Sequence, residues 1–465
     1  MSKLEVTNPQ SGERLAVLEK ASLEEIVSLV AGAKEAQKEW GRKSMYARSQ
    51  VLYRFLELYR ERAEEIAKII SLEMGKTKKE SLEEVEKTAV NIRGTIERAN
   101  HLYGQVLPDS DPDYEEDLVF TKRVPIGLIG CIIPFNYPVE LTIWKVIPAL
   151  LMGNALVVKA PSSNPLAVLK IREILVEAGV PEAVIPFIVC DRGDCTEGII
   201  KNPKVDALTL TGSTAAGIQM AENSAKFLKP LFLELGGNDP FIICHDADIH
   251  LAVEEMVSGR MCNAGQTCCA PKRFLVDRRI EKKLTAVLEE RLSKIKVGNA
   301  WDDHTELATL VTEQAAEGVE AQVHQTIEEG AEVVCGGRRK GAYYAPTVLA
   351  KVTRDMEIAR DLEIFGPVFP IIAFDTEEEA IEIANQSSYA LNAGVLAGDT
   401  MRAMRIAAQV DAGSIVVNGH GLFRHMDQAH GGPKMSGLGR EGISCSLEEF
   451  SEVKNYILKG AFRVI

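Results

Sequence analysis

The chain has 465 residues, of which 46% are hydrophobic and 26% are charged, a composition typical of a globular protein with a large core. Its 53 Lys and Arg residues are outnumbered by 67 Asp and Glu residues, so the formal net charge is −14. This balance argues against a nucleic-acid-binding protein that neutralises phosphates. The length predicts two or three domains.

The N-terminus carries no apolar run behind its first basic residue, so we expect no secretory signal. The longest apolar stretches, such as "IGLIGCIIPF" (126–135), are too short to span a membrane. Nine cysteines without regular spacing argue against a disulfide framework, and the absence of any CxxC pair argues against a metal site. We therefore expect a cytoplasmic protein with reduced thiols and no metal.

Residues 22–103 are predicted to be helical, because apolar residues recur every three or four positions within 48–75. A polar stretch rich in Pro and Asp (104–117) follows and indicates an arm. Beyond it, strands predicted at 124–135, 155–160, 184–190 and 206–212 alternate with helices predicted at 142–153 and 165–179. Such alternation predicts an α/β fold with a doubly wound parallel sheet, which binds ligands at the carboxyl ends of its strands.

A second alternating region begins near residue 239 and continues to about residue 430. Within it, residues 248–265 are predicted to form a helix that ends shortly before Cys268. The negative end of a helix dipole disfavours a thiolate nearby. The C-terminal segment 447–460 is predicted to be an edge strand without a partner in its own neighbourhood.

Six short stretches lie at predicted strand ends or turns. They are "PFNYP" (134–138), "VVKAPSSNP" (157–165), "LTGSTAAG" (210–217), "LELGGNDP" (233–240), "NAGQTCCAPKRF" (263–274) and "EIFGPV" (363–368). In their order and spacing they resemble the aldehyde dehydrogenase superfamily along nearly the whole chain. The resemblance is to the NAD(P)-dependent, hydrolytic branch, with semialdehyde and lactaldehyde dehydrogenases among its members.

The resemblance assigns the nucleophile to Cys268 and leaves Cys269 as its inert neighbour. A thiolate adds readily to an aldehyde carbonyl and gives a tetrahedral thiohemiacetal. The resemblance implies that the Asn136 amide and the Cys268 backbone N–H hold the oxyanion. It further implies that Glu234 activates the water that hydrolyses the resulting thioester, with Lys159 as a fourth site residue. Taken singly, Glu234 and Asn136 could each be turn residues; together with Cys268 they favour chemistry.

The resemblance also implies a nicotinamide cofactor. Its predicted contacts are Pro134, Phe135, Lys159, Ser162, Gly212, Ser213, Gly217, Leu235, Glu363 and Phe365. Many NAD-specific members carry a glutamate at the position of Ser162, where a carboxylate would repel a 2′-phosphate. Serine can donate a hydrogen bond to that phosphate, and Lys159 adds positive charge. We therefore predict that NADP is preferred and that NAD is the alternative.

The predicted substrate pocket departs from the succinate-semialdehyde pattern, because Trp144 and Cys262 replace its two arginines. We predict a short hydroxylated or anionic aldehyde that contacts Arg424, since arginine is well suited to grip a carboxylate, sulfonate or phosphate. The alternative for Arg424 is a salt bridge at a subunit contact. Tyr137 and Trp144 are predicted to form an aromatic wall, with core packing as the alternative.

The segment that contains Arg424 departs from the family pattern at a second point. Ala429 and His430 precede the double glycine where the family usually has Pro-Phe. Together with Arg424 and His425, His430 makes this loop unusually polar and cationic.

The resemblance implies three structural units. We predict an NAD(P)-binding domain (1–104 and 126–236), a catalytic domain (237–434) and an oligomerisation element (105–125 and 435–465). Because exposed sheet edges are usually covered, we expect a homodimer or homotetramer. Two alternative functions remain open: transfer of the acyl group to coenzyme A, which the presence of Glu234 disfavours, and a non-catalytic structural or binding role.

Overall fold

The computed structural model describes residues 2–108 and 111–463. An N-terminal hairpin, β1 (Lys3–Thr7) and β2 (Arg14–Glu19), precedes four helices: α1 (Leu23–Arg42), α2 (Met45–Glu61), α3 (Ala63–Met74) and α4 (Lys78–Ala99). Ser22 and Thr77 form capping boxes that start α1 and α4, because each hydroxyl accepts a hydrogen bond from an otherwise unpaired N–H. The predicted helical character of this region is confirmed.

The first sheet has six strands in the order β18-β8-β7-β4-β5-β6. Its strands are β4 (Leu128–Ile132), β5 (Ala155–Lys159), β6 (Phe187–Ile188), β7 (Ala207–Thr211), β8 (Leu231–Glu234) and β18 (Gly437–Leu438). The helices among them are α5 (Pro138–Leu151), α6 (Leu166–Ala178), α7 (Arg192–Cys195) and α8 (Thr214–Ser224). All pairs are parallel except β18 with β8. The strand order reverses at β4, which places a ligand crevice at the carboxyl ends of β4 and its neighbours.

The second sheet has seven strands in the order β11-β14-β15-β10-β9-β16-β17. They are β9 (Pro240–Ile243), β10 (Arg273–Asp277), β11 (Glu332–Cys335), β14 (Thr347–Val352), β15 (Val368–Phe374), β16 (Asn392–Leu396) and β17 (Ser414–Val417). Its helices are α9 (Ile249–Met261), α10 (Arg278–Leu292), α11 (Glu313–Glu328), α12 (Glu377–Asn385) and α13 (Thr400–Ala407), and a short hairpin joins β12 (Arg339–Lys340) to β13 (Tyr343–Tyr344). The predicted α/β class with parallel sheets is confirmed.

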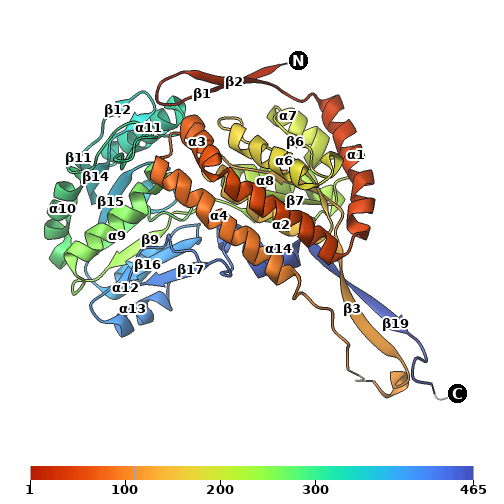
Figure 1. The fold of residues 1–465 in the computed structure, drawn as a ribbon. Coiled ribbons are helices and arrows are strands. Elements are labelled where there is room, and N and C mark those ends of the chain that lie inside the picture. The colour runs from red at the N-terminus through yellow and green to blue at the C-terminus, as the bar shows by residue number, and fades with distance from the viewer. Residues whose placement is uncertain (1, 109–110, 464–465) are drawn as a thin grey trace.

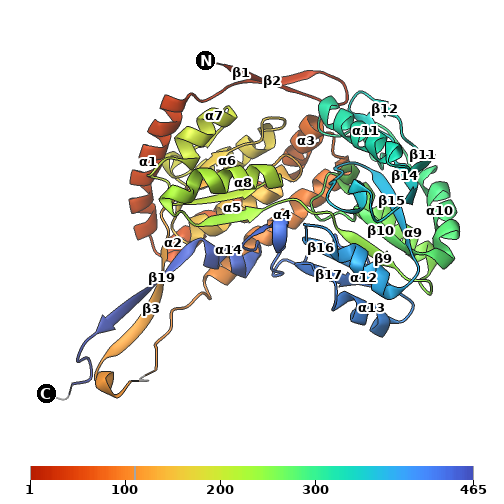
Figure 2. The same cartoon turned by 180° about the vertical axis from the view of Figure 1, so that it is seen from behind.

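A two-stranded ribbon projects from the body of the molecule and carries the C-terminus at its tip (Figures 1 and 2). It pairs β3 (Leu118–Pro125) with β19 (Ser451–Leu458) in antiparallel register. The strand predicted at 447–460 was expected to have no partner in its own neighbourhood of the chain; its first residues instead end α14, and β19 finds its partner in the distant β3. Helix α14 (Ile443–Glu449) packs against α4 and α5 before β19 leaves the body. Residues 109–110 and 464–465 of the predicted oligomerisation element lie outside the described residues.

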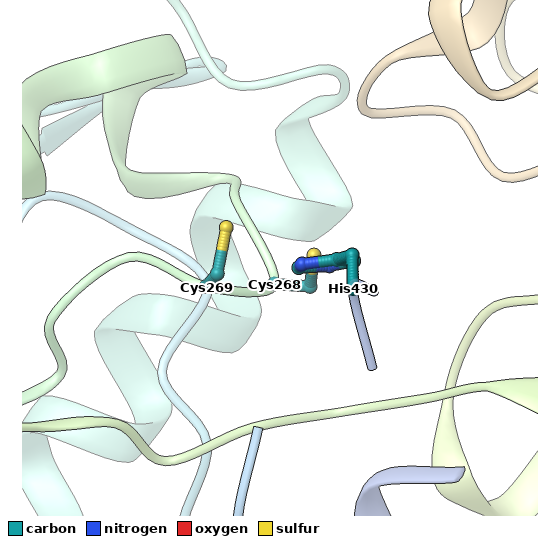
Figure 3. A group of neighbouring side chains, drawn as sticks. All are labelled: Cys268, Cys269 and His430. Carbon is teal, nitrogen blue, oxygen red and sulfur yellow. The ribbon is translucent and has the colours of Figure 1, made fainter. Parts of the chain in front are cut away.

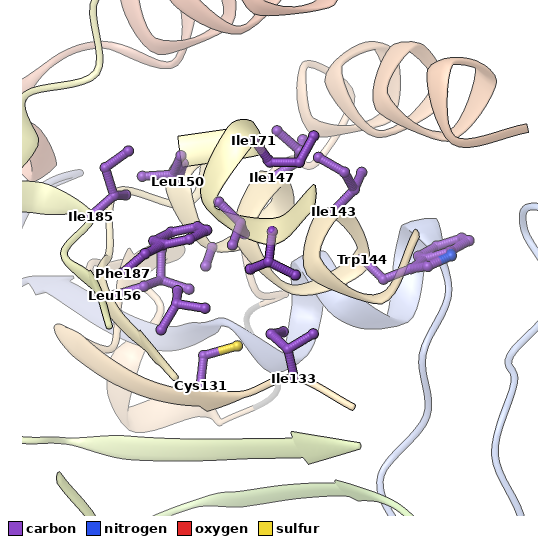
Figure 4. Packing of buried hydrophobic residues seen from close by; sticks show 14 of the residues in the cluster. Cys131, Ile133, Ile143, Trp144, Ile147, Leu150, Leu156, Ile171, Ile185 and Phe187 are labelled. Carbon is purple, nitrogen blue, oxygen red and sulfur yellow. The ribbon is translucent and has the colours of Figure 1, made fainter. Parts of the chain in front are cut away.

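The first sheet packs with its helices around one apolar cluster, part of which is shown in Figure 4. Cys131 and Leu156 lie among its isoleucine and leucine side chains, whereas Trp144 on α5 points away from the rest of the cluster. The second sheet has a separate apolar cluster. Among the described residues, no helix combines the length and the hydrophobicity needed to cross a membrane.

Candidate active site

The loop that carries Cys268 leaves α9 through an unusual turn. Helix α9 ends at Met261, and the next residues include Asn263, Ala264 and Gly265 with φ values of 52°, 53° and 79°. A Cβ at Gly265 would lie 2.2 Å from the carbonyl oxygen of Gly366, so only glycine fits there. The helix therefore stops before the cysteine, as predicted, and the chain turns away from its axis.

Lys272 fixes the other side of this loop. Its buried ammonium donates to the backbone carbonyls of Thr267, Cys268 and Ala270, and it lies 3.4 Å from the carboxylate of Glu363. Because one ammonium donates all three hydrogen bonds, it holds the backbone on both sides of Cys268 in place.

Asn136 lies in the loop between β4 and α5. Its backbone carbonyl accepts hydrogen bonds from Lys76 Nζ (3.0 Å) and Asn263 Nδ2 (2.9 Å). Lys76 in turn forms a buried ion pair with Glu84 (2.6 Å). With this backbone fixed, the Asn136 side-chain amide makes no hydrogen bond to any described residue, and neither does the Cys268 backbone N–H. Both predicted oxyanion donors are therefore free to bind a ligand.

Glu234 ends strand β8 and is followed by two glycines. The carboxylate is buried, and neither of its oxygens has a hydrogen-bond partner among the described residues. A Cβ at Gly236 would lie 2.5 Å from Glu363, and one at Gly237 would lie 3.1 Å from the Cys268 carbonyl oxygen. The double glycine thus lets the Cys268 loop and Glu363 approach the end of β8.

A pocket of about 360 Å³ opens onto Cys268. Asn136, Tyr137, Trp144 and Arg424, all predicted site residues, line it together with Cys262, Cys269 and Met426. The Arg424 guanidinium stacks on Trp144, 4.6 Å from the ring centroid. It also lies 3.5 Å from Glu441, which forms a second ion pair with Lys145. Within this chain, then, Arg424 faces the pocket.

The Cys268 thiol lies in an environment that raises its pKa. Its contact with Cys269 is the largest cause, followed by burial and by the negative charge of Glu234. An interaction with the imidazole of His430 acts in the opposite direction and lowers the pKa of Cys268.

Figure 3 shows the His430 ring next to the Cys268 sulfur. The potential ligand atoms of Cys268, Cys269 and His430 all lie within 4.8 Å of one another. We assign no metal to this cluster, because a cysteine bound as a metal thiolate would not be available as a nucleophile.

Apart from Glu363 and Phe365, which lie in the connection before β15, the predicted cofactor residues follow the carboxyl ends of β4, β5, β7 and β8. Lys159 Nζ and Ser162 Oγ lie 3.4 Å apart at the end of β5. Ser213 caps α8, where its hydroxyl oxygen accepts from Ala216 N and its O–H stays available to a phosphate. Helix N-termini favour anions, so this end of the sheet fits a pyrophosphate.

The contacts of the remaining predicted cofactor residues explain why each position holds the amino acid it does. A Cβ at Gly217 would lie 2.6 Å from Leu235, so glycine lets α8 pack closely on β8. Phe135 meets Phe365 edge to face with 6.0 Å between ring centroids. Pro134 lies in the loop between β4 and α5, two residues before Asn136. Glu363 accepts a hydrogen bond from Gly237 N (3.2 Å), close to the Cys268 loop.

Two groups in this site were not singled out by their positions in the sequence, whereas His430 was marked by its departure from the Pro-Phe pattern. Lys272 could have been found as a basic residue entering an apolar strand. The Lys76–Glu84 pair gives no local signal, because Lys76 lies in the short connection between α3 and α4 and Glu84 is one of many charged residues in α4.

With this geometry in place, the comparison with known proteins defines the class. Residues 1–456 match the model of the aldehyde dehydrogenase family. The chain therefore belongs to the aldehyde dehydrogenase family, as the six stretches predicted. This family uses NAD(P) and oxidises aldehydes, which confirms the predicted cofactor class and enzyme class.

Individual relatives are similar over nearly the full length. The chain is 35% identical to the 3-sulfolactaldehyde dehydrogenase of Priestia aryabhattai, with 98% of this chain and 95% of that protein covered. It is 33% identical to the lactaldehyde dehydrogenase of Methanococcus aeolicus, covering 98% and 97%. The solved glyceraldehyde-3-phosphate dehydrogenase of Methanocaldococcus jannaschii, complexed with NADP, superposes with a TM-score of 0.93 at 32% identity, covering 98% and 99%.

Proposed function

We propose that the protein oxidises an aldehyde to a carboxylic acid with NAD(P)⁺ and water. The observation that carries this proposal is the convergence of Cys268 and Asn136 on one pocket, with Glu234 buried close to the same loop. The Cys268 thiolate attacks the aldehyde carbon, and the Asn136 amide and Cys268 N–H stabilise the oxyanion. Bound NAD(P)⁺ supplies the hydride acceptor. Glu234 then takes a proton from the water that hydrolyses the thioester.

One assay distinguishes the proposed reaction from the two alternative functions. A coenzyme A-acylating enzyme needs no carboxylate base, and the buried carboxylate of Glu234, whose oxygens accept no hydrogen bond from the described residues, therefore favours water as the acceptor. A non-catalytic protein has no need of unpaired oxyanion donors beside a cysteine. The test is the appearance of reduced nicotinamide with a panel of short aldehydes, with and without coenzyme A. Turnover that requires coenzyme A, or no turnover at all, would contradict the proposal.

The proposed substrate is a short hydroxylated or anionic aldehyde. Arg424 and Lys87 are the cations that line the pocket, and the Nε of Arg424 is buried without a partner among the described residues. Two relatives are named for sulfolactaldehyde and lactaldehyde, which are short and hydroxylated. Trp144 and Cys262 line the same pocket in place of the two arginines of the succinate-semialdehyde pattern.

Replacement of Arg424 with methionine is expected to lower kcat/KM for anionic aldehydes about 10- to 100-fold, the effect of losing a charged hydrogen bond. Activity on neutral short aldehydes should fall much less. Glu441 keeps its pairing with Lys145 in this variant, so the fold should persist. Steady-state kinetics on matched sulfonated, carboxylated and aliphatic aldehydes measures the difference. Equal activity on all three, unchanged from wild type, would leave Arg424 without a substrate role.

We also propose that NADP is preferred over NAD. Ser162 is exposed next to Lys159, where the pair can hold a 2′-phosphate. Ser162→Glu is expected to shift the ratio of kcat/KM values toward NAD by about 10- to 100-fold, through lost hydrogen bonding and added repulsion. Ser162→Gln, of the same size without the charge, is the control. A wild-type enzyme with strong NAD preference would contradict the proposal.

The proposed organisation assigns residues 1–104 and 126–236 to cofactor binding, 237–434 to catalysis, and 105–125 with 435–465 to oligomerisation. The projecting ribbon supports the last assignment, because the outer edge of β19 has no strand partner among the described residues, whereas the outer edge of β3 pairs with residues 105–107. We propose a cytoplasmic homodimer or homotetramer, which sedimentation of the full chain would distinguish.

A further inference from the structure

His430 lies beside the nucleophile, at a position where the family pattern has no histidine. The usual Pro-Phe would place an apolar ring before the double glycine, whereas this chain places an imidazole there. A buried imidazole in contact with a reactive cysteine can do what a phenyl ring cannot, since it carries a proton and a charge.

The position of His430 is fixed by its own backbone. His430 and Glu441 exchange two hydrogen bonds, N to O, of 2.6 and 2.7 Å. The side chain is 1% exposed and its Nε2 lies 3.4 Å from Glu234 Oε1. The ring also lies next to the sulfur of Cys268, with Cys269 beyond (Figure 3). The imidazole thus lies close to both reacting groups of the proposed mechanism.

Several charged groups face His430 from the elements packed against it. Burial and the positive charge of Arg424 lower the pKa of His430, but contacts with Cys268 and Glu234 outweigh them and leave it raised, to about 9. Glu441 also faces the ring, but Lys145 and Arg424 already pair with it. Glu234 has no other cation among the described residues. His430 is therefore an imidazolium at neutral pH.

We propose that His430 is a catalytic residue whose imidazolium holds the Cys268 sulfur as a thiolate. This inference rests on the proposed function, because it takes Cys268 as the nucleophile. In the step, the S–H bond breaks, the proton passes to water in the open pocket, and the negative sulfur pairs with the positive ring. When the sulfur is later bound as a neutral thioester, the ring retains its contact with Glu234.

The rest of the site disfavours the thiolate that the proposed reaction requires. Burial, Cys269 and Glu234 all disfavour a charged sulfur, and contact with His430 favours it. Helix α9 offers no help, because only its C-terminal end, at Met261, precedes the Cys268 loop, and a helix C-terminus disfavours a thiolate. Cysteine reactivity follows the thiolate fraction, so His430 should set the pH range in which Cys268 reacts.

The test measures the thiol itself, without cofactor or substrate. The rate at which iodoacetamide alkylates Cys268 is followed against pH by peptide mass, in wild type, His430→Phe and His430→Gln. Both variants should alkylate at least tenfold more slowly near neutral pH, the effect of one pKa unit. They should approach the wild-type rate at alkaline pH, where the thiol ionises unaided. His425→Gln, an exposed histidine of the same loop, is the matched control and should keep the wild-type profile.

Alkylation profiles of both variants that match wild type would overturn the inference. If neither variant folds, a second measurement decides. The ultraviolet absorbance of the Cys268 thiolate is obtained as the difference between wild type and Cys268→Ser, and it is followed against pH. Ionisation of Cys268 only at or above the ordinary cysteine pKa, about 8.5, also overturns the inference. Failure here is distinguishable from failure of the proposed function. An inactive Cys268→Ser variant with unchanged His430 profiles refutes only this inference, whereas an active one refutes the proposed function.

Discussion

Replacement of Cys268 with serine is expected to abolish aldehyde oxidation, with kcat falling by at least about 1,000-fold. The serine oxygen is a much weaker nucleophile at neutral pH, because a hydroxyl ionises far less easily than a thiol. The loop should keep its shape, because Lys272 and the turn through Gly265 hold the backbone and do not depend on the sulfur.

The measurement is the rate of reduced nicotinamide formation under saturating aldehyde and cofactor. Cys335→Ser is the matched control: this cysteine lies in β11, at the edge of the second sheet, and should retain full activity. Turnover within a few-fold of wild type in Cys268→Ser would mean that no covalent bond to this sulfur is required.

The second large effect is expected from Glu234→Gln. The amide keeps the size of the side chain but cannot accept a proton from water, so hydrolysis of the thioester should slow by about 100- to 10,000-fold. The first half of the reaction does not need this base once Cys268 is ionised. The variant should therefore release one equivalent of reduced nicotinamide rapidly and then stop.

Rapid-mixing kinetics would show this burst, and mass spectrometry of the intact protein would show the acyl group on Cys268. Glu328→Gln at the exposed end of α11 is the control and should show no burst of this kind. Loss of the burst together with loss of turnover would place Glu234 before the thioester instead of after it.

Several of the site residues that the sequence predicted follow strands of the first sheet. Asn136, Lys159, Gly212 and Glu234 each end or follow a strand of the first sheet. In a doubly wound sheet such positions meet at one edge. The order of strands and helices along the chain was therefore enough to bring these residues together, once the motifs had marked them.

The sequence did not place His430 against Cys268, because that contact depends on a long irregular loop and not on a strand end. The loop is positioned by its bridge to Glu441 and by the pairing of β18 with β8. Strand β18 has only two residues, too few to produce an alternating pattern that could be recognised. Lys272 escaped notice for another reason: its partners are backbone carbonyls, which any residue type supplies.

The antiparallel pairing of β18 with β8 joins residues far apart in the chain, Gly437 with Glu234 and Leu438 with Leu233. His430 precedes β18 by a few residues, so the pairing of β18 with β8 also brings His430 close to Glu234. A nascent chain that ends before His430 thus lacks both the strand that pairs beside Glu234 and the ring beside the Cys268 thiol. The proposed reactive centre is therefore complete only after residues 430–438 have been synthesised.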